Sequence, residues 1–159
     1  MEYKCALLVV DNVEKSRFLY EKILGQEIEV DFGENVAFLG GFAIHQKSHF
    51  EQLIAGHPVT QKSNNHELYF EDDQLEIIVE TLKEHDFSFL HEIIEQPWRQ
   101  RVVRFYDYDD HIIEIGERME HVAYRLYKEG KSIEEICRVT YLPEEIVKNA
   151  IKESRSLPS

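Results

Sequence analysis

The sequence contains little cysteine, little basic charge and no long hydrophobic run. Its two cysteines, Cys5 and Cys137, form no spaced pair, which predicts reduced thiols in a cytoplasmic protein. Near the start only Ala6–Val10 is continuously apolar before Asp11, so the pattern of a signal peptide is missing. No apolar run reaches the length that a membrane span needs. We therefore expect a cytoplasmic chain that makes no membrane contact.

Several familiar motifs are missing as well. The sequence has no glycine-rich phosphate loop, no CxxC pair and no nucleophile elbow. These absences argue against nucleotide-binding, zinc-finger and serine-hydrolase classes. Basic residues number 18 against 31 acidic ones, a net charge of −13. Such a chain would repel nucleic acid and anionic membranes, and it favours cationic or neutral partners.

The acidic excess is confined to one part of the chain. Residues 1–116 hold 10 basic and 23 acidic side chains, whereas residues 117–159 hold 8 of each. A hydrophobic content of 43% in 159 residues is enough for one domain and an appendage. The composition therefore predicts a body of residues 1–116 and an extension of residues 117–159.

The body contains one pattern used twice: a strand, an amphipathic helix and three more strands. In the first unit the helix begins near Asp11 and ends at Gly25. The strands of this unit are Cys5–Val10, Glu27–Phe32, Val36–Leu39 and Phe42–Gln46. In the second unit the helix begins near Asp73, and the strands are His66–Glu71, Phe87–Ile94, Arg101–Tyr106 and His111–Ile115. The predicted class is α+β with two βαβββ units.

Four side chains occupy matching positions in the two units. An offset of 61 residues places Cys5 opposite His66, and His45 lies opposite Glu114 in the last strands. Glu114 is the most informative of them, because it stands among isoleucines in HIIEI. A carboxylate there is costly unless it is paired, hydrogen-bonded or bound to a metal. Its partner could instead be Arg101 or Arg104, or the strand register could turn it to solvent.

Three stretches resemble the vicinal oxygen chelate superfamily, which includes glyoxalase I, extradiol dioxygenases and the fosfomycin- and bleomycin-resistance proteins. They are VVDNVEKSRFLYEKILG, NNHELYFEDDQLEIIVETL and RVVRFYDYDDHIIEIGE, within about residues 3–116. The resemblance implies that the two βαβββ units form one curved, eight-stranded cup. It also implies a homodimer, because cups of this superfamily are commonly completed across a subunit interface.

The resemblance further implies a metal site. His66 and Glu114 match ligand positions of the family, with His45 as a third, while Cys5 stands where a histidine is usual. In the turn Asp107–Asp110, Asp110 takes the place of the family's glycine, and aspartate tolerates a left-handed backbone. The superfamily also contains metal-free cups, so one divalent ion or none remains open.

A site of His, His and Glu suits Zn²⁺, Mn²⁺, Ni²⁺ or Fe²⁺ and leaves positions for a substrate. In such a site Glu114 could double as the catalytic proton carrier. The walls of the substrate pocket would include Trp98, on a loop over the cup, together with Arg101 and Phe105. The alternatives to a role in the pocket are packing at a domain edge for Trp98 and core packing for Phe105.

The extension predicts three short helices. The first runs from Met119 to Gly130, Ser132 and Glu135 form the capping box of the second, and Pro143 opens the third. The run KSIEEICRVTYLPEEIVKNAI resembles a helix-turn-helix. Its third helix begins with two glutamates, and at the DNA-reading end of the helix they would be repelled by the phosphates. A helical appendage that covers the sheet or joins subunits is the preferred interpretation.

Two functions remain after this reasoning. The first is a glyoxalase-like, metal-assisted lyase or isomerase that acts on a small oxygen-rich molecule. The second is a metal-free protein that binds a small molecule, as in bleomycin resistance. His66 with Glu114 favours the first, and the acidic body favours the second with a cationic ligand. A ligand-responsive DNA-binding regulator is the third and least favoured.

Overall fold

The computed structural model describes residues 1–156, with side chains through Glu153. Contacts within the chain define two compact units. Unit 1 combines Met1–Glu67, Thr81–Ser88 and Phe105–Ile113. Unit 2 combines Leu68–Glu80, Phe89–Arg104 and the chain from Glu114 onward. Unit 1 therefore contains the turn Asp107–Asp110, far along the sequence from the N-terminal strand.

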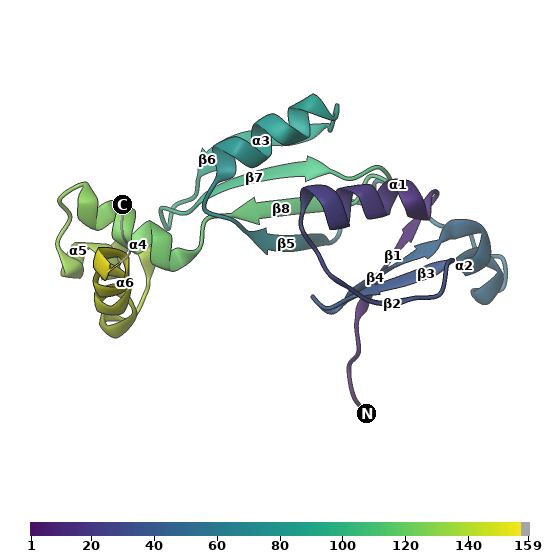
Figure 1. Ribbon diagram of the computed structural model, residues 1–159, viewed down its shortest axis with the longest axis horizontal. Coiled ribbons are helices and arrows are strands. Elements are labelled where there is room, and N and C mark those ends of the chain that lie inside the picture. Colours follow the sequence, from purple (N-terminus) through teal and green to yellow (C-terminus); the bar gives the residue numbers. More distant parts are fainter. Residues whose placement is uncertain (157–159) are drawn as a thin grey trace. The chain divides into compact units, whose positions relative to one another are not determined.

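The first four strands form a sheet in unit 1 (Figure 1). The strands are β1 (Ala6–Val10), β2 (Ile28–Asp31), β3 (Asn35–Phe38) and β4 (Phe42–Gln46), in the order β1-β4-β3-β2. β1 is parallel to β4, and the other pairs are antiparallel. One face carries the apolar core, in which Leu8 lies beside Ile44 and Tyr20 is fully buried.

The first helix lies between β1 and β2. Its N-cap is Asn12, whose side chain accepts a hydrogen bond from the Lys15 amide, so the sequence-based placement of the start at Asp11 was one residue early. The helix α1 (Val13–Arg17) continues into a wider π-helical turn, η1 (Phe18–Ile23). Gly25 follows with a φ of 63°, the left-handed conformation in which glycine pays no steric penalty.

The second four strands repeat this order. The strands are β5 (Glu67–Glu71), β6 (Phe89–Glu95), β7 (Arg101–Tyr106) and β8 (Ile112–Gly116), and they lie side by side in the order β5-β8-β7-β6. The helix α3 (Leu75–Glu84) follows β5 along the chain. The prediction of two βαβββ units in an α+β fold is confirmed. The eight strands form two four-stranded sheets. Their union in a single cup stays a prediction. A short helix not in the repeat, α2 (Lys47–Leu53), follows β4.

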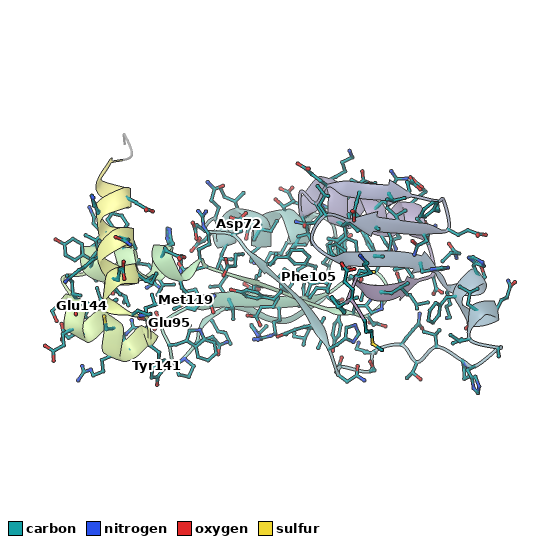
Figure 2. The ribbon with its side chains drawn as sticks, turned by 90° about the horizontal axis from the view of Figure 1, so that it is seen from below. Asp72, Glu95, Phe105, Met119, Tyr141 and Glu144 are labelled. Carbon is teal, nitrogen blue, oxygen red and sulfur yellow. The ribbon has the colours of Figure 1, made fainter. Side chains whose placement is uncertain are left out.

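The predicted three-helix extension is present as α4 (Met119–Lys128), α5 (Ile133–Thr140) and α6 (Glu144–Ser156). The predicted capping box of Ser132 and Glu135 is confirmed. Tyr141, labelled in Figure 2, lies in the turn between α5 and α6. Its side chain is 81% exposed. These helices share their own buried cluster: Val122, Ala123, Leu126, Ile136, Val147, Ala150 and Ile151. Residues 157–159 of the predicted extension lie outside the described part.

A buried carboxylate connects α4 to the second sheet inside unit 2. Glu117 is fully buried and accepts hydrogen bonds from Arg101 Nε at 2.8 Å and Arg125 Nη2 at 2.9 Å. Burial alone would raise the pKa of Glu117, but the two guanidinium groups outweigh it and lower the pKa. Arg118 binds Asp73 in the same unit. No helix within residues 1–156 is both long and apolar enough to cross a membrane.

Candidate functional site

The turn between β7 and β8 is organised by the buried carboxylate of Asp107. Its Oδ1 accepts the backbone amides of Asp109 and His111, both at 2.9 Å. Its Oδ2 accepts the hydroxyl of Tyr20 at 2.8 Å and Nδ1 of His111 at 2.9 Å. Asp110 in this turn has a φ of 64°, as its position in place of a glycine predicts. Four donors thus fix one side chain.

Asp107 and His111 form a hydrogen-bonded pair whose members stabilise each other's charge. Burial would raise the pKa of Asp107, but the bond to His111 and its charge lower it overall. Burial would lower the pKa of His111, but the bond to Asp107 and its charge raise it. Because Asp107 accepts the proton on Nδ1, the other ring nitrogen, Nε2, is left to interact with a ligand.

Asp109 ties the same turn to the start of α1. Its Oδ1 accepts the Asp11 amide at 2.7 Å, and its Oδ2 lies 3.4 Å from the hydroxyl of Ser16. Burial raises the pKa of Asp109, and the charges of Asp107 and Asp11 add to this effect. The sequence predicts only a tight turn in this segment. The structure shows that the buried carboxylates of Asp107 and Asp109 also hold the turn against the first helix.

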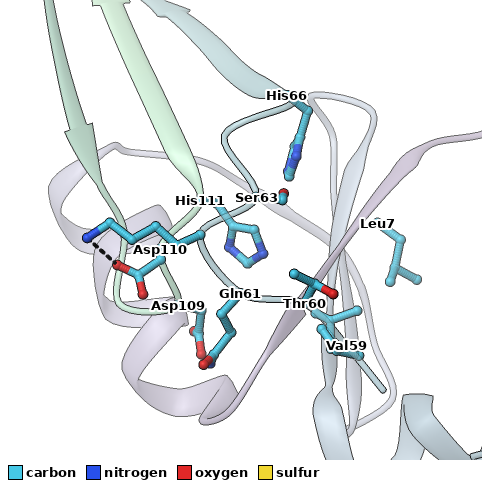
Figure 3. Close-up of a pocket in the computed structure, with 11 residues that line it drawn as sticks. Leu7, Val59, Thr60, Gln61, Ser63, His66, Asp109, Asp110 and His111 are labelled. Atoms are coloured by element: carbon cyan, nitrogen blue, oxygen red, sulfur yellow. Dashed lines mark ion pairs between the residues drawn. The ribbon is translucent and has the colours of Figure 1, made fainter. Parts of the chain in front are cut away.

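A cavity of about 160 Å³ opens beside this turn in unit 1 (Figure 3). One side is apolar and consists of Leu7, Val9 and Val59. The polar side consists of Thr60, Gln61, Lys62, Ser63, His66, Asp109, Asp110 and His111. Lys62 pairs with Asp110 at 3.7 Å. The cavity is smaller than the roughly 300–1,000 Å³ typical of drug-sized ligands, so it fits a small compound.

His66, a predicted metal ligand, lies at this cavity. Its ring packs edge-on to that of His111, with centroids 5.6 Å apart. Its Nδ1 lies 3.2 Å from the side-chain oxygen of Asn65. The side chain is exposed, so it belongs to the rim.

His45, the second predicted histidine, belongs to a different network. It projects to the same face as its neighbour Val9 on β1, but both of its ring nitrogens have partners. Nδ1 lies 3.0 Å from the Asn35 amide nitrogen, and Nε2 lies 3.0 Å from Nδ1 of His49. Burial and the charge of His49 lower the pKa of His45. This geometry holds a neutral, hydrogen-bonded histidine.

Glu114 lies in unit 2 with an ion-pair partner. It is 5% exposed and forms an ion pair with Arg104, one of the two arginines that the sequence offered. It alternates along β8 with the buried Ile113 and Ile115, so it projects to the face opposite their core. Cys5, the doubtful ligand, is exposed.

The three predicted pocket residues are each engaged elsewhere. Trp98 Nε1 donates to the side chain of Gln100 at 2.9 Å. Arg101 binds Glu117 and Glu76. Phe105 is fully buried (Figure 2), with its ring edge-on to Phe87 at 5.6 Å. It therefore fits the alternative of core packing.

These placements do not suit a divalent cation. Glu114 is neutralised by a guanidinium, and both nitrogens of His45 are satisfied by neighbours. Within residues 1–156, no three His, Cys, Asp or Glu side chains are grouped so that they could hold a metal ion. The chemistry that the described residues do offer is hydrogen bonding at the cavity of His66 and His111.

Sequence reasoning did not single out His111 or Asp107 as functional. The available signal was the spacing of an aspartate and a histidine four residues apart across a tight turn, which brings the two side chains to one side. The linker residues Thr60, Gln61 and Ser63 carry no pattern of their own. Only the folded chain places them at the cavity.

The strand order β1-β4-β3-β2, repeated as β5-β8-β7-β6, defines a protein of the vicinal oxygen chelate class. The family model for the glyoxalase-like domain matches residues 3–120. The chain belongs to this glyoxalase-like family. None of the curated proteins compared with the chain matches it.

Solved structures agree with this membership. A protein of unknown function from Agrobacterium tumefaciens is 34% identical, with a TM-score of 0.66 over 74% of this chain and 94% of that chain. The fosfomycin resistance protein FosX from Listeria monocytogenes is 18% identical, with a TM-score of 0.55 over 74% of this chain and 93% of its own. A lactoylglutathione lyase from Agrobacterium tumefaciens is 17% identical, with a TM-score of 0.54 over 70% and 90%. The last two identities show a shared fold only.

Proposed function

We propose that the protein is a metal-independent member of the glyoxalase-like family that binds a small organic molecule. The observation that carries this proposal is the ion pair of Glu114 with Arg104. A buried carboxylate that is paired with a guanidinium binds a cation poorly, because the cation would displace the arginine and leave a charge without its partner. Metal-assisted lyase chemistry is the alternative that the test must distinguish.

Two further observations support the proposal. Cys5 replaces the usual histidine and is exposed, so it makes a poor fourth ligand as placed. A small cavity with both apolar and polar walls is present in unit 1, and this mixture is typical of small-molecule sites.

The first test is metal content. Protein purified without an affinity-tag metal and without chelator should contain less than about 0.1 metal ion per chain, since a site with the high affinity typical of structural zinc would stay filled. The variant Glu114→Gln should show the same low content as the parent. One metal ion per chain that is lost in Glu114→Gln would overturn the proposal.

The second test is activity with added metal. Formation of lactoylglutathione should stay at the background rate after addition of Zn²⁺, Ni²⁺, Mn²⁺ or Fe²⁺. A metal-dependent rate that disappears in Glu114→Gln would place the protein among the lyases instead. Arg99→Met, which removes a half-buried arginine paired with Glu95, is the control for the loss of one paired charge.

A further inference from the structure

The cavity beside the β7–β8 turn offers hydrogen-bond acceptors in excess of donors. Asp107 accepts the Nδ1 proton of His111, so in the neutral ring Nε2 is an acceptor. His66 is arranged in the same way by Asn65. The carboxylates of Asp109 and Asp110 add negative charge, and Lys62 offsets one of them. A ligand that complements this lining must bring donors.

Apolar contact is available on the opposite wall. Leu7 and Val9 alternate along β1 with the buried core residues Leu8 and Val10, so their side chains project from the other face. Val59 joins them at the cavity. Figure 3 shows Leu7 and Val59 on one side and the ring of His111 among the polar residues. A suitable ligand therefore has a short apolar part and a polar, donor-bearing end.

We propose that this cavity binds a small aliphatic amine or amino alcohol through Nε2 of the neutral ring of His111, in which only Nδ1 carries a proton. This inference rests on the proposed function, because it names the ligand class of the same binding protein. A protonated amine supplies three donors and a positive charge, and it complements Asp109 and Asp110. The cavity volume of about 160 Å³ restricts the ligand to a few non-hydrogen atoms.

Asp107 is a positioning residue in this proposal. It contacts no ligand, but it fixes the tautomer and the orientation of His111 through the bond at 2.9 Å. Asp107 also accepts hydrogen bonds from Tyr20 and from two backbone amides, and these bonds fix the position of its carboxylate. The ring of His111 is thereby prepared for a ligand before one arrives, which lowers the entropic cost of binding.

The test compares two compounds of one length and opposite charge. 4-Amino-1-butanol and 4-hydroxybutanoate are titrated into EDTA-treated protein at about pH 9, which favours the neutral imidazole and lies below the pKa of about 10.4 of a primary amine. The imidazole signals of His111 and His66 are followed by NMR. The amine should bind with a dissociation constant on the order of 1 mM, as small ligands do, and it should shift both histidines. The anion should bind at least about tenfold more weakly, a difference of one hydrogen bond or ion pair. Equal binding of the two compounds, or no shift at His111, would overturn the proposal.

Variants locate the binding in the cavity. His111→Phe keeps an aromatic ring but removes Nε2, and it should weaken amine binding by about tenfold. The matched control is His57→Phe, at an exposed histidine that does not line the cavity, which should bind as the parent does. If His111→Phe fails to fold, ¹⁵N signals of the parent still test the site: a Nδ1–H tautomer is expected, and an Nε2–H tautomer would contradict the proposal.

The role of Asp107 has its own readout. In Asp107→Asn the ¹⁵N signals of His111 should show a mixture of tautomers, together with weaker amine binding. An unchanged tautomer would reject the positioning role. Failure here is distinct from failure of the proposed function, because metal content and lyase activity are measured without the amine. If the protein contains no metal and does not bind 4-amino-1-butanol, the amine-binding inference is wrong and the proposed function is unaffected.

Discussion

Asp107 and Asp109 lie two residues apart in one turn, yet their pKa values shift in opposite directions. Both are nearly inaccessible to solvent, with 6% and 5% exposure. Asp107 has a histidine and a tyrosine as donors, and these outweigh the cost of burial. Asp109 has mainly a backbone amide, and the neighbouring carboxylates add repulsion, so its pKa is raised. The number and charge of the donors decide the sign.

This contrast predicts different costs for removing each charge. Asp107→Asn should lower the free energy of unfolding by about 2–4 kcal/mol, because an amide cannot accept all four donors and leaves buried ones unsatisfied. Asp109→Asn should cost about 0–1 kcal/mol at neutral pH, since it removes a charge that burial already disfavours. Urea denaturation of both variants checks this. Equal costs for the two would contradict the account of the turn.

The His111–Asp107 pair also predicts a pH dependence. The pKa of His111 is raised above 6.5 in the folded state, so its stabilisation is complete below 6.5 and is lost as pH rises through the higher folded-state value. The difference in unfolding free energy between parent and His111→Gln should therefore be larger at about pH 5.5 than at about pH 9. His57→Gln, at an exposed position, should show no such trend. A difference that grows with pH would reverse the assignment.

Sequence reasoning at single residues succeeded where the partner was close in the pattern. Glu114 was expected to need a partner, and Arg104, on the neighbouring strand β7, is that partner. The partner of His45 was not foreseen, because His49 lies in α2 and contacts His45 only after the chain turns from strand to helix. Asp107 was also missed, since its donor Tyr20 is 87 residues away.

At the scale of elements, the sequence predicts strands better than it predicts their ends. β7 runs from Arg101 to Tyr106 as predicted. The prediction succeeds because the stretch rich in β-branched and aromatic residues nearly coincides with the strand. β6 begins two residues later than predicted, at Phe89. Phe87 is instead buried against Phe105 and Tyr108. An apolar residue before a strand cannot be told from the strand itself by composition.

The junction of β8 and the extension predicts the effect of a single methyl group. A Cβ at Gly116 would lie 2.7 Å from Nε2 of Gln100, which is itself bonded to Tyr69 and to the backbone of Glu117. Gly116→Ala should therefore cost about 1–3 kcal/mol by overpacking. Gly40→Ala is a control, because its nearest neighbour would be at 3.5 Å. Thermal unfolding of both variants measures the difference, and an unchanged transition in Gly116→Ala would contradict this packing.

At the scale of the whole molecule, charge separates two parts of the chain. The extension has as many basic as acidic side chains, whereas residues 1–116 carry all of the net −13. The first turn of α6 carries Glu144 and Glu145, and Glu144 is paired with Lys148. These acids occupy the end that a recognition helix would place against DNA. The extension is better suited to contacts with protein than to contacts with nucleic acid.

The remaining prediction concerns assembly. We expect a homodimer, because the extension has no net charge and can meet a second copy without the repulsion that the acidic body would impose. Sedimentation equilibrium at low micromolar concentration should give twice the mass of 18.9 kDa. A monomer at every concentration would contradict the expectation. The same measurement at high salt separates an apolar interface, which persists, from a charged one, which weakens.

Unit 1 draws on three separated stretches of chain, and this has a consequence for the order in which the protein acquires its structure. The bonds of Tyr20 to Asp107 and of Asp11 to Asp109 close loops of 87 and 98 residues. During synthesis at about 5–20 residues per second, the first helix must therefore wait several seconds for its partners to leave the ribosome. Until then the apolar surface of the N-terminal strand and helix is available to chaperones. Synthesis, rather than local helix or hairpin formation, sets the earliest moment at which this unit is complete.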